Sequence, residues 1–241
     1  MIETLQKYKV PRYEQVRWQI QKLLTEGRWD KTTPLPTEQE LAERYEVSVG
    51  TVRKAVEKLV EDGILFKQQG KGTFLKQPNF EHSLSRFFKF RDKDSAYVTP
   101  IGVIKKIAEI PALEHINEKL KQDKNATLIY LERVRIINDK IIVSEKIWLP
   151  KSRFEPLITL DSNEFGSLLY PFYYKKCGQF VFSATETLFF IKDHADYYLK
   201  NSEHEPLVKV CRIAKNLNGE PIEYRESYGL AEHFSYEISI N

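Results

Sequence analysis

The chain has 241 residues, of which 41% are hydrophobic and 29% charged, and a formal net charge of +3. This length suits two domains, and the absence of a signal peptide or a membrane-length apolar run leads us to expect a cytoplasmic protein. Two cysteines, Cys177 and Cys211, exclude a disulfide framework, and no Cys or His spacing is typical of a metal site. Residues 1–77 carry 14 Lys and Arg against 11 Asp and Glu, so the whole positive excess lies in the N-terminal part.

Residues 11–63 are predicted to form three helices, and a tight turn joins the last two. The first helix spans 11–26 and ends at Gly27. At the start of the second helix, Thr37 takes the N-cap position and Glu40 follows three residues later, which is the spacing of a capping box.

The third helix is predicted from strong apolar periodicity, with Ser48 as its N-cap and Gly63 just after its end. Its apolar positions are Val52, Ala55, Val56, Leu59 and Val60. Two short β-like runs, 64–66 and 73–75, then flank a basic hairpin tip. Helix, turn, helix and basic hairpin is the order of a winged helix-turn-helix, so residues 1–77 are predicted to bind double-stranded DNA.

The polar face of the third helix supports this prediction. A recognition helix reads base edges with its N-terminal residues, while Arg, Lys and helix N–H groups hold phosphates. The alternative is an ordinary solvated face, which the capped helix, the turn and the basic wing together disfavour. The predicted DNA-contacting residues are Gln39, Ser48, Val49, Thr51, Arg53, Lys54, Gly70, Lys71 and Gly72.

Residues 78–88 are predicted to be a linker, because Pro78 disfavours continuation of the wing strand. Residues 89–241 are expected to form an α+β domain with a mostly antiparallel sheet. Helices are predicted at 111–121, 166–177 and 193–199, the last capped by Asp193. Strands are predicted at 126–137, 141–149, 179–191, 207–217, 221–229 and 232–240, with hairpin turns at 138–140 and 218–219.

Five motifs in the N-terminal part resemble the GntR family of bacterial transcription factors. They are Pro11-Arg12-Tyr13-Glu14-Gln15, Leu35-Pro36-Thr37-Glu38-Gln39-Glu40-Leu41-Ala42, Val47-Ser48, Thr51-Val52-Arg53-Lys54-Ala55 and Gly70-Lys71-Gly72-Thr73-Phe74. The remainder resembles, by pattern, the effector domain of the HutC branch of that family, the UTRA domain, whose fold is like that of chorismate lyase. The resemblance implies a homodimer that binds a short palindromic operator and a small metabolite that alters its affinity. No cofactor is expected.

Two positions depart from the usual family pattern. Gln39 stands where the family usually has arginine. The chain has Val47-Ser48-Val49 where the family usually has Val-Ser-Arg, so Val49 replaces a second arginine. Both arginines commonly contact the operator, whereas Thr51, Arg53 and Gly70 match. Gln can pair bidentately with adenine, and Val can only contact a thymine methyl. The resemblance therefore implies a shifted operator sequence.

In the strand predicted at 126–137, two arginines occupy positions where apolar residues are expected. Alternation places Arg133 and Arg135 on one side, and a three-residue hairpin loop places Glu145 opposite Arg133 and Val143 opposite Arg135. An arginine pair suits a phosphate or carboxylate, and Glu145 suits a hydroxyl or amine. In relatives, matching positions often line a pocket for phosphorylated sugars. A solvated sheet face with cross-strand ion pairs is the alternative.

Five further residues are candidates for the effector site. Ser167 opens a predicted helix, where it could help to hold an anion or act as an ordinary N-cap. Phe90 and Arg91 match a segment that can fold over the effector in the family, and a surface loop is the alternative. Glu223 and Tyr228 match effector-contacting positions in some relatives, although alternating strand polarity explains them equally well.

Together these features predict a homodimeric transcriptional regulator, a repressor rather than an activator, that responds to an anionic metabolite such as a sugar phosphate. Effector binding would change the spacing of two DNA-binding heads, with a coupling on the order of 1–3 kcal/mol. One alternative is a chorismate-lyase-like enzyme, which turnover of chorismate would reveal, although fold alone does not transfer activity. The other is a non-sensing DNA-binding protein, which a thermal-shift ligand screen would distinguish from a sensor.

Overall fold

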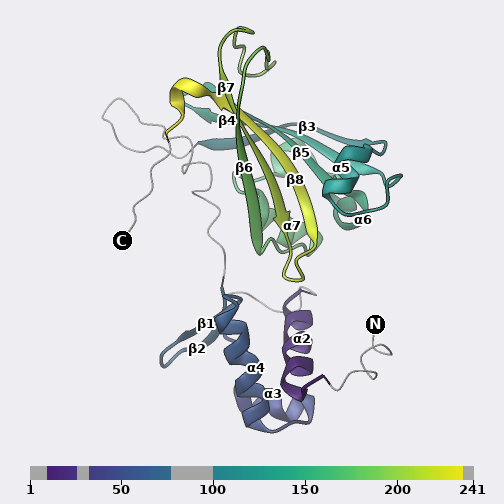
Figure 1. The fold of residues 1–241 in the computed structure, drawn as a ribbon, viewed down its shortest axis with the longest axis vertical. Coiled ribbons are helices and arrows are strands. Elements are labelled where there is room, and N and C mark those ends of the chain that lie inside the picture. The colour runs from purple at the N-terminus through teal and green to yellow at the C-terminus, as the bar shows by residue number, and fades with distance from the viewer. Residues whose placement is uncertain (1–9, 26–32, 77–99, 236–241) are drawn as a thin grey trace. The chain divides into compact units, whose positions relative to one another are not determined.

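The computed structural model describes residues 10–25, 33–76 and 100–235 (Figure 1). The chain divides into two compact units, residues 1–78 and 79–241. The predicted linker at 78–88, the candidates Phe90 and Arg91, and Gly27 lie outside the described residues. Within the described ranges, no helix has the length and apolar character needed to cross a bilayer.

The described residues of the first unit form three helices around a small apolar core: α2 (Arg12–Thr25), α3 (Glu38–Tyr45) and α4 (Val49–Glu61). The predicted capping box is confirmed, because the Glu40 backbone N–H donates to Thr37 Oγ1 over 3.2 Å and the Thr37 N–H donates to the Glu40 carboxylate over 2.7 Å. Helix α3 ends where Glu46 takes a left-handed conformation, with φ of 52°. The buried core residues include Val16, Ile20, Leu24, Leu41, Val52, Val56 and Leu59.

Ser48 caps α4 as predicted, accepting a hydrogen bond from the Thr51 N–H over 3.2 Å. After α4, Gly63 adopts φ of 69° and the chain turns into strand β1 (Leu65–Gln68), which pairs antiparallel with β2 (Gly72–Leu75). This hairpin is the predicted wing. The Leu35 N–H donates to the Thr73 carbonyl over 2.7 Å, which ties the wing to the segment that precedes α3.

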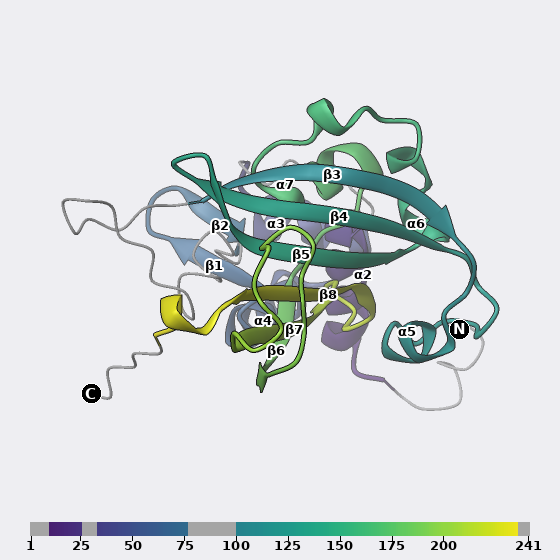
Figure 2. The ribbon, with the colours of Figure 1, turned by 90° about the horizontal axis from the view of Figure 1, so that it is seen from above.

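The second unit is built on one antiparallel sheet with the strand order β3-β4-β5-β8-β7-β6 (Figure 2). This confirms the predicted α+β class and antiparallel sheet. The predicted pairs Arg133–Glu145 and Arg135–Val143 are also confirmed, but the three-residue loop predicted at 138–140 is wrong. Ile137 pairs with Lys140, so the loop has two residues, and a register shift between Arg135 and Ile136 restores the predicted pairs. The strands are β3 (Ile101–Ile110), β4 (Leu128–Ile137), β5 (Lys140–Pro150), β6 (Ser183–Ile191), β7 (Leu207–Lys215) and β8 (Pro221–Leu230).

Helices cover the sheet on both faces (Figure 2). Helices α6 (Lys151–Phe154) and α7 (Leu169–Cys177) pack on the face that we call the α7 face, and α5 (Glu114–Lys119) packs on the opposite α5 face. Buried residues of the α7 face include Ile129, Leu131, Ile147, Leu149, Phe154 and Tyr173. Those of the α5 face include Ile116, Leu120, Leu128, Trp148 and Tyr224.

Three further sequence predictions for this unit are corrected. Residues 193–199 form no helix; instead the Asp196 side chain accepts the N–H groups of Tyr198 and Leu199 over 2.9 and 3.0 Å, which closes a single turn. Helix α7 begins at Leu169 rather than 166. The strand predicted at 232–240 starts instead with a 3-10 turn, Ala231–His233, and residues beyond 235 lie outside the described part.

Candidate functional site

The predicted DNA-contacting residues lie on α3, on α4 with its N-cap, and at the wing tip. Val52, Ala55 and Val56 are buried as core, which leaves the polar side of α4 accessible. Thr51 is half-buried, and its hydroxyl lies 2.9 Å from that of Ser48. The exposed members are Gln39, Ser48, Val49, Arg53, Lys54, Gly70, Lys71 and Gly72.

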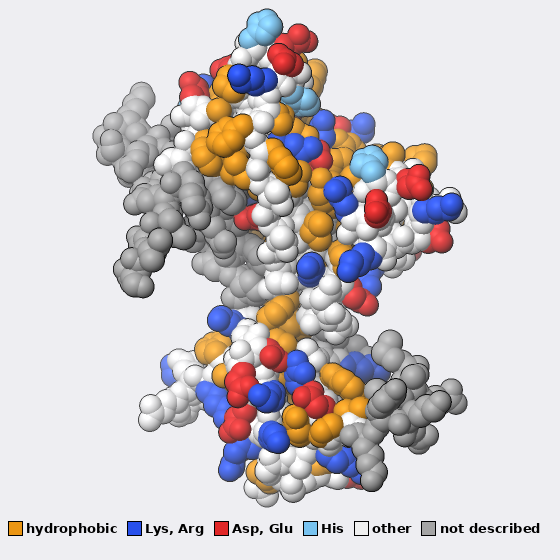
Figure 3. All heavy atoms as spheres, viewed as in Figure 1, with side chains coloured by type: hydrophobic (Ala, Val, Ile, Leu, Met, Phe, Trp, Pro, Cys, Tyr) orange, Lys and Arg blue, Asp and Glu red, His pale blue; other side chains and the backbone are white. Residues whose placement is uncertain are grey.

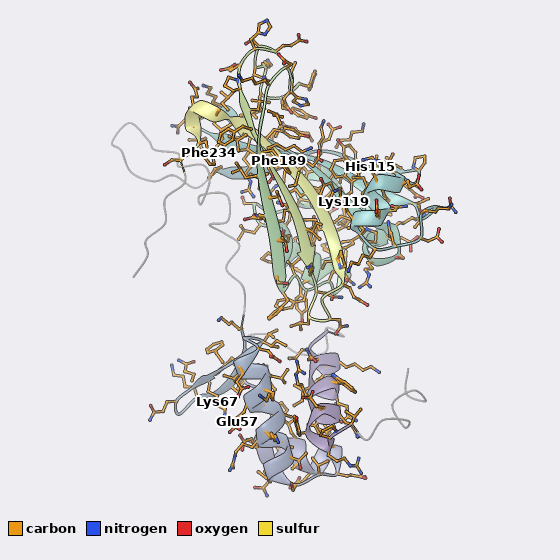
Figure 4. All side chains as sticks on the ribbon, viewed as in Figure 1. Glu57, Lys67, His115, Lys119, Phe189 and Phe234 are labelled. Atoms are coloured by element: carbon orange, nitrogen blue, oxygen red, sulfur yellow. The ribbon has the colours of Figure 1, made fainter. Side chains whose placement is uncertain are left out.

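One carboxylate on this surface joins α3, α4 and the wing. Glu38 accepts a hydrogen bond from Arg53 Nε over 2.9 Å and lies 3.7 Å from Nζ of Lys67 on β1. Figure 4 labels Lys67 on the wing. Because the contact with Glu38 uses Nε, the two terminal nitrogens of Arg53 keep the fork that can bind a phosphate or a guanine. Sequence reasoning did not include Glu38 or Lys67 among the predicted DNA-contacting residues.

Both wing glycines adopt backbone conformations with positive φ, which residues with a side chain rarely adopt. Gly70 adopts φ of 73° in the hairpin turn. Gly72 adopts φ of 121°, and a Cβ there would lie 2.8 Å from Cβ of Pro34. Any larger residue at position 72 would therefore push the wing away from Pro34, in the segment that precedes α3.

A second candidate site lies on the α7 face, where the strands carry charged side chains in place of apolar ones. All of these side chains belong to residues that are at most 8% exposed. Alternation brings them to the same face from β4, β5, β8 and β7. We call them the arginine cluster: Arg133, Arg135, Glu145, Arg212, Glu223, Arg225 and Ser227.

Glu145 lies at the centre of the arginine cluster. Its carboxylate accepts hydrogen bonds from Arg133 Nη1 over 3.0 Å and from Arg225 Nη1 over 3.3 Å, and it lies 3.4 Å from Arg135 Nε. The Ser227 hydroxyl donates to it over 3.3 Å. Burial alone would raise the pKa of Glu145, but the positive charges of these three arginines hold that pKa well below its ordinary value.

The second carboxylate, Glu223, ties α7 to the sheet. It pairs with Arg225 Nη2 over 2.8 Å and accepts the hydroxyls of Tyr170 and Tyr173, each over 2.9 Å. Arg212 donates to the Tyr170 hydroxyl over 3.1 Å. The polar contacts of the sheet thereby extend into the helix that covers it.

The remaining contacts hold the two ends of the cluster. Arg212 also forms an ion pair with Glu186 on β6, and Arg133 donates to the backbone carbonyl of Ser167. Gly102 on β3 lies directly against Arg133, because a Cβ at this position would fall 1.8 Å from Nη2. Only glycine leaves room for this guanidinium.

The cluster contains more positive than negative groups. Four arginines face three carboxylates when Glu186 is included. The Nε groups of Arg133, Arg135 and Arg225 are buried and donate no hydrogen bond within the described ranges. Burial lowers the pKa of Arg135 to about 10 against the opposing effect of Glu145, so Arg135 stays protonated at neutral pH. Such a site is suited to an additional anion.

The structure brings together most of the effector residues predicted from sequence. Arg133, Arg135, Glu145 and Glu223 belong to the cluster, whereas Ser167 contributes its carbonyl and caps no helix, since α7 starts two residues later. Tyr228 lies on the α5 face, where its hydroxyl donates to Glu226 over 2.7 Å and its ring stacks on His194.

Sequence reasoning missed Arg212 and Arg225. Arg225 could have been predicted from strand alternation, because it lies two residues after Glu223 in β8 and therefore on the same face of the sheet. Tyr228 is five residues from Glu223, and so alternation places it on the other face.

Comparisons with protein families match both units. Residues 12–75 match the family described as "Bacterial regulatory proteins, gntR family", and residues 99–235 match the UTRA domain. The second match covers more than half of the chain.

Individual proteins agree with these matches. The "Probable fructoselysine utilization operon transcriptional repressor" of Escherichia coli K12 is 29% identical over 230 residues, which cover 94% of this chain and 93% of that protein. The "HTH-type transcriptional repressor NagR" of Bacillus subtilis is 30% identical over 162 residues, covering 67% and 65%. The crystal structure of PhnF from Mycobacterium smegmatis has the same fold, with a TM-score of 0.51 at 19% identity over 94% of this chain and 99% of that one.

We predict that Gly102→Ala destabilises the second unit by about 1–3 kcal/mol, because the new methyl group must displace the buried Arg133 guanidinium. Thermal denaturation of the full chain measures the effect. Gly166→Ala is the matched control, since a Cβ at Gly166 meets no atom within 4 Å. Equal melting temperatures for the two variants would contradict the close packing of Gly102 on Arg133.

We also predict a change in the pH dependence of stability for Glu145→Gln. The folded-state pKa of Glu145 is lower than that of the unfolded chain, so its stabilising effect is complete above about pH 4.3 and is lost as the pH falls through the folded value. Removing this charge leaves three buried arginines without their shared partner and costs about 3–5 kcal/mol at pH 7. Denaturant unfolding between pH 3 and 7 should show a smaller acid-induced loss in the variant than in the wild type.

Proposed function

The chain belongs to the GntR family of bacterial regulatory proteins and carries a UTRA domain, and from this we propose that it is a transcriptional repressor whose operator affinity is controlled by an anionic, sugar-derived metabolite. The observation that carries the effector half of this proposal is the excess of buried arginine around Glu145. The site of action would be the cytoplasm, where the DNA lies.

The first unit supplies the DNA-binding half. Arg53 and Lys54 extend from the exposed side of α4, and Lys67 and Lys71 extend from the wing. The exposed Val49 suits a thymine methyl, and Gln39 suits adenine, so the operator would differ from that of family members with arginine at these positions. Two such heads on a homodimer would contact major grooves about 34 Å apart on a pseudo-palindrome.

The second unit supplies the sensing half. Arg135 is the most weakly held arginine of the cluster, because its one ion pair among the described residues is the 3.4 Å contact with Glu145. An incoming phosphate or carboxylate would take a bidentate position on its guanidinium. The sugar class is supported by the name of the Escherichia coli relative, a fructoselysine utilisation repressor.

The effector would act on DNA affinity through the cluster. Arg133 holds the Ser167 carbonyl just before α7, and Glu223 holds two tyrosines of α7. A bound anion that changes the arginine geometry would therefore shift α7 between two arrangements. To release the operator, the effector must bind one arrangement more tightly than the other.

We expect Arg53→Ala to weaken operator binding by about 1–3 kcal/mol with little loss of stability, because the side chain is exposed and its terminal nitrogens are directed to DNA in this proposal. The operator is first selected from random duplexes, and binding is then titrated at several salt concentrations. Lys58→Ala removes one charge from the same helix where it is ion-paired with Glu61 over 2.5 Å, and it serves as the control. Wild-type affinity in Arg53→Ala would remove this arginine from the interface.

We expect Arg135→Ala to lose effector binding while the second unit stays folded. Loss of a charged hydrogen-bond donor costs about 1.5–3 kcal/mol of effector affinity, which is roughly tenfold or more. Sugar phosphates should raise the melting temperature of the wild type by mass action and not that of the variant. Lys124→Ala, an exposed charge loss in the same unit, should respond like the wild type. A full response in Arg135→Ala would place the effector elsewhere.

A further inference from the structure

Strand β6 is an edge of the six-stranded sheet, and its outer side is unusually open to pairing. All residues from Ser183 to Ile191 pair with β7 in one unbroken register. On its other side, β6 has no neighbour among the described strands. Its one charged residue, Glu186, is engaged by Arg212, and β6 has no Lys, Arg or Pro. A long, regular edge of this kind is a template for another strand.

The opposite edge, β3, shows the protection that β6 lacks. Its pairing with β4 shifts register between Ile104 and Lys106, which bends the strand locally. Lys105 and Lys106 add charge at the bend, and the 3-10 turn Ser162–Glu164 packs against the strand. Both devices discourage a further strand. The contrast indicates that the β6 edge has an occupant.

Two large aromatic side chains of β6 remain exposed. Phe189 is 48% and Phe190 is 65% exposed, and as neighbours in a strand they point to opposite faces of the sheet. Apolar side chains gather over this part of the second unit in Figure 3, and Figure 4 marks Phe189 there. A single edge strand that exposes apolar rings on both faces is suited to a partner that continues the sheet.

We propose that β6 pairs antiparallel with β6 of a second copy of this chain, so that two sheets join into one. The proposal specifies the contact of the homodimer that forms part of the proposed function. Pairing all nine residues of β6 places the two-fold axis at Thr187. Thr187 of one copy then lies opposite Thr187 of the other, and residues equally far from Thr187 on either side pair with each other.

The sequence of β6 fits this self-pairing. Its small residues lie in the first half and its large residues in the second, so antiparallel pairing sets Phe190 opposite Ala184 and Phe189 opposite Thr185. Glu186 falls opposite Leu188, so the pairing places no like charges together. A second copy of β6 therefore matches large residues with small ones and brings no like charges together.

Cross-linking of the full-length chain through Thr187→Cys tests the proposed axis. Opposite residues of an antiparallel pair have Cα atoms about 4.5–5.5 Å apart, within the range of about 4.4–6.8 Å that a disulfide bridges. Under mild oxidation we expect a covalent dimer as the main species on a non-reducing gel. The wild type, with Cys177 and Cys211 only, and Lys124→Cys, at another exposed position, should give several-fold less.

A charge pair gives a second readout that does not depend on cysteine. Thr187→Lys and Thr187→Glu each place like charges opposite one another, so each variant alone should dissociate at least tenfold more readily in light scattering. Mixing them should restore the dimer, because opposite charges then meet. Since Thr187 is exposed, both variants should keep the wild-type circular dichroism spectrum.

The outcomes separate this proposal from the proposed function. A wild-type dimer with no Thr187→Cys cross-linking above the controls, and no effect of Thr187→Lys, would overturn β6 pairing while the homodimer stands. A wild type that is monomeric at micromolar concentration and binds its operator fully would overturn the dimer as well. Loss of operator selection altogether would instead count against the proposed function.

Discussion

The ionised carboxylate of Glu145 is the group on which the second unit depends. Three guanidiniums lie within 3.4 Å of it in the interior of the sheet. Without that carboxylate, three like charges would share a region of low dielectric: Arg133 and Arg135 would lose their ion pair, and Arg225 would keep only Glu223. The glycine at position 102 follows from the same constraint, because Arg133 fills the space above β3. So does the fixed β4–β5 register, since a slip of one residue would turn the arginines toward the α5 face.

Such a cluster is a poor means of stabilising a fold. Buried ion pairs often contribute less than well-packed apolar residues of the same volume would, and this one has a surplus of positive charge. The surplus of positive charge would favour binding of an anion. The arginines are already ordered in the folded protein, so little conformational entropy would be lost on binding. The connection from Arg225 through Glu223 to Tyr170 and Tyr173 then gives the bound anion a route to α7. This is the contact that could distinguish two arrangements of the unit.

Sequence alone predicted the local parts of this site. Sequence set Arg133 opposite Glu145 through a three-residue loop at 138–140, whereas the strands turn at Asn138 and Asp139 and a register shift between Arg135 and Ile136 restores that pairing. The contact from Arg225 to Glu145 spans 80 residues, and no local pattern encodes it. Strand β3 escaped prediction because Lys105 and Lys106 interrupt its alternation at the register shift. The motifs of the first unit, by contrast, were predicted well, since caps and turns act over three or four residues.

In the first unit, Glu38 presents the opposite problem, because it places a negative charge on the surface that we propose binds DNA. Repulsion from DNA lowers non-specific affinity, which depends on net positive charge. The ordering of Arg53 by Glu38 would offset this repulsion. An arginine held at Nε presents its terminal nitrogens in one orientation, so less side-chain entropy is lost when a base or phosphate is bound. With Gln39 and Val49 in place of the two arginines that are usual in the family, this surface has fewer positive charges that can bind phosphates. In the proposed interface, a larger share of the affinity would therefore come from contacts that depend on sequence, which would favour selectivity over tight non-specific binding.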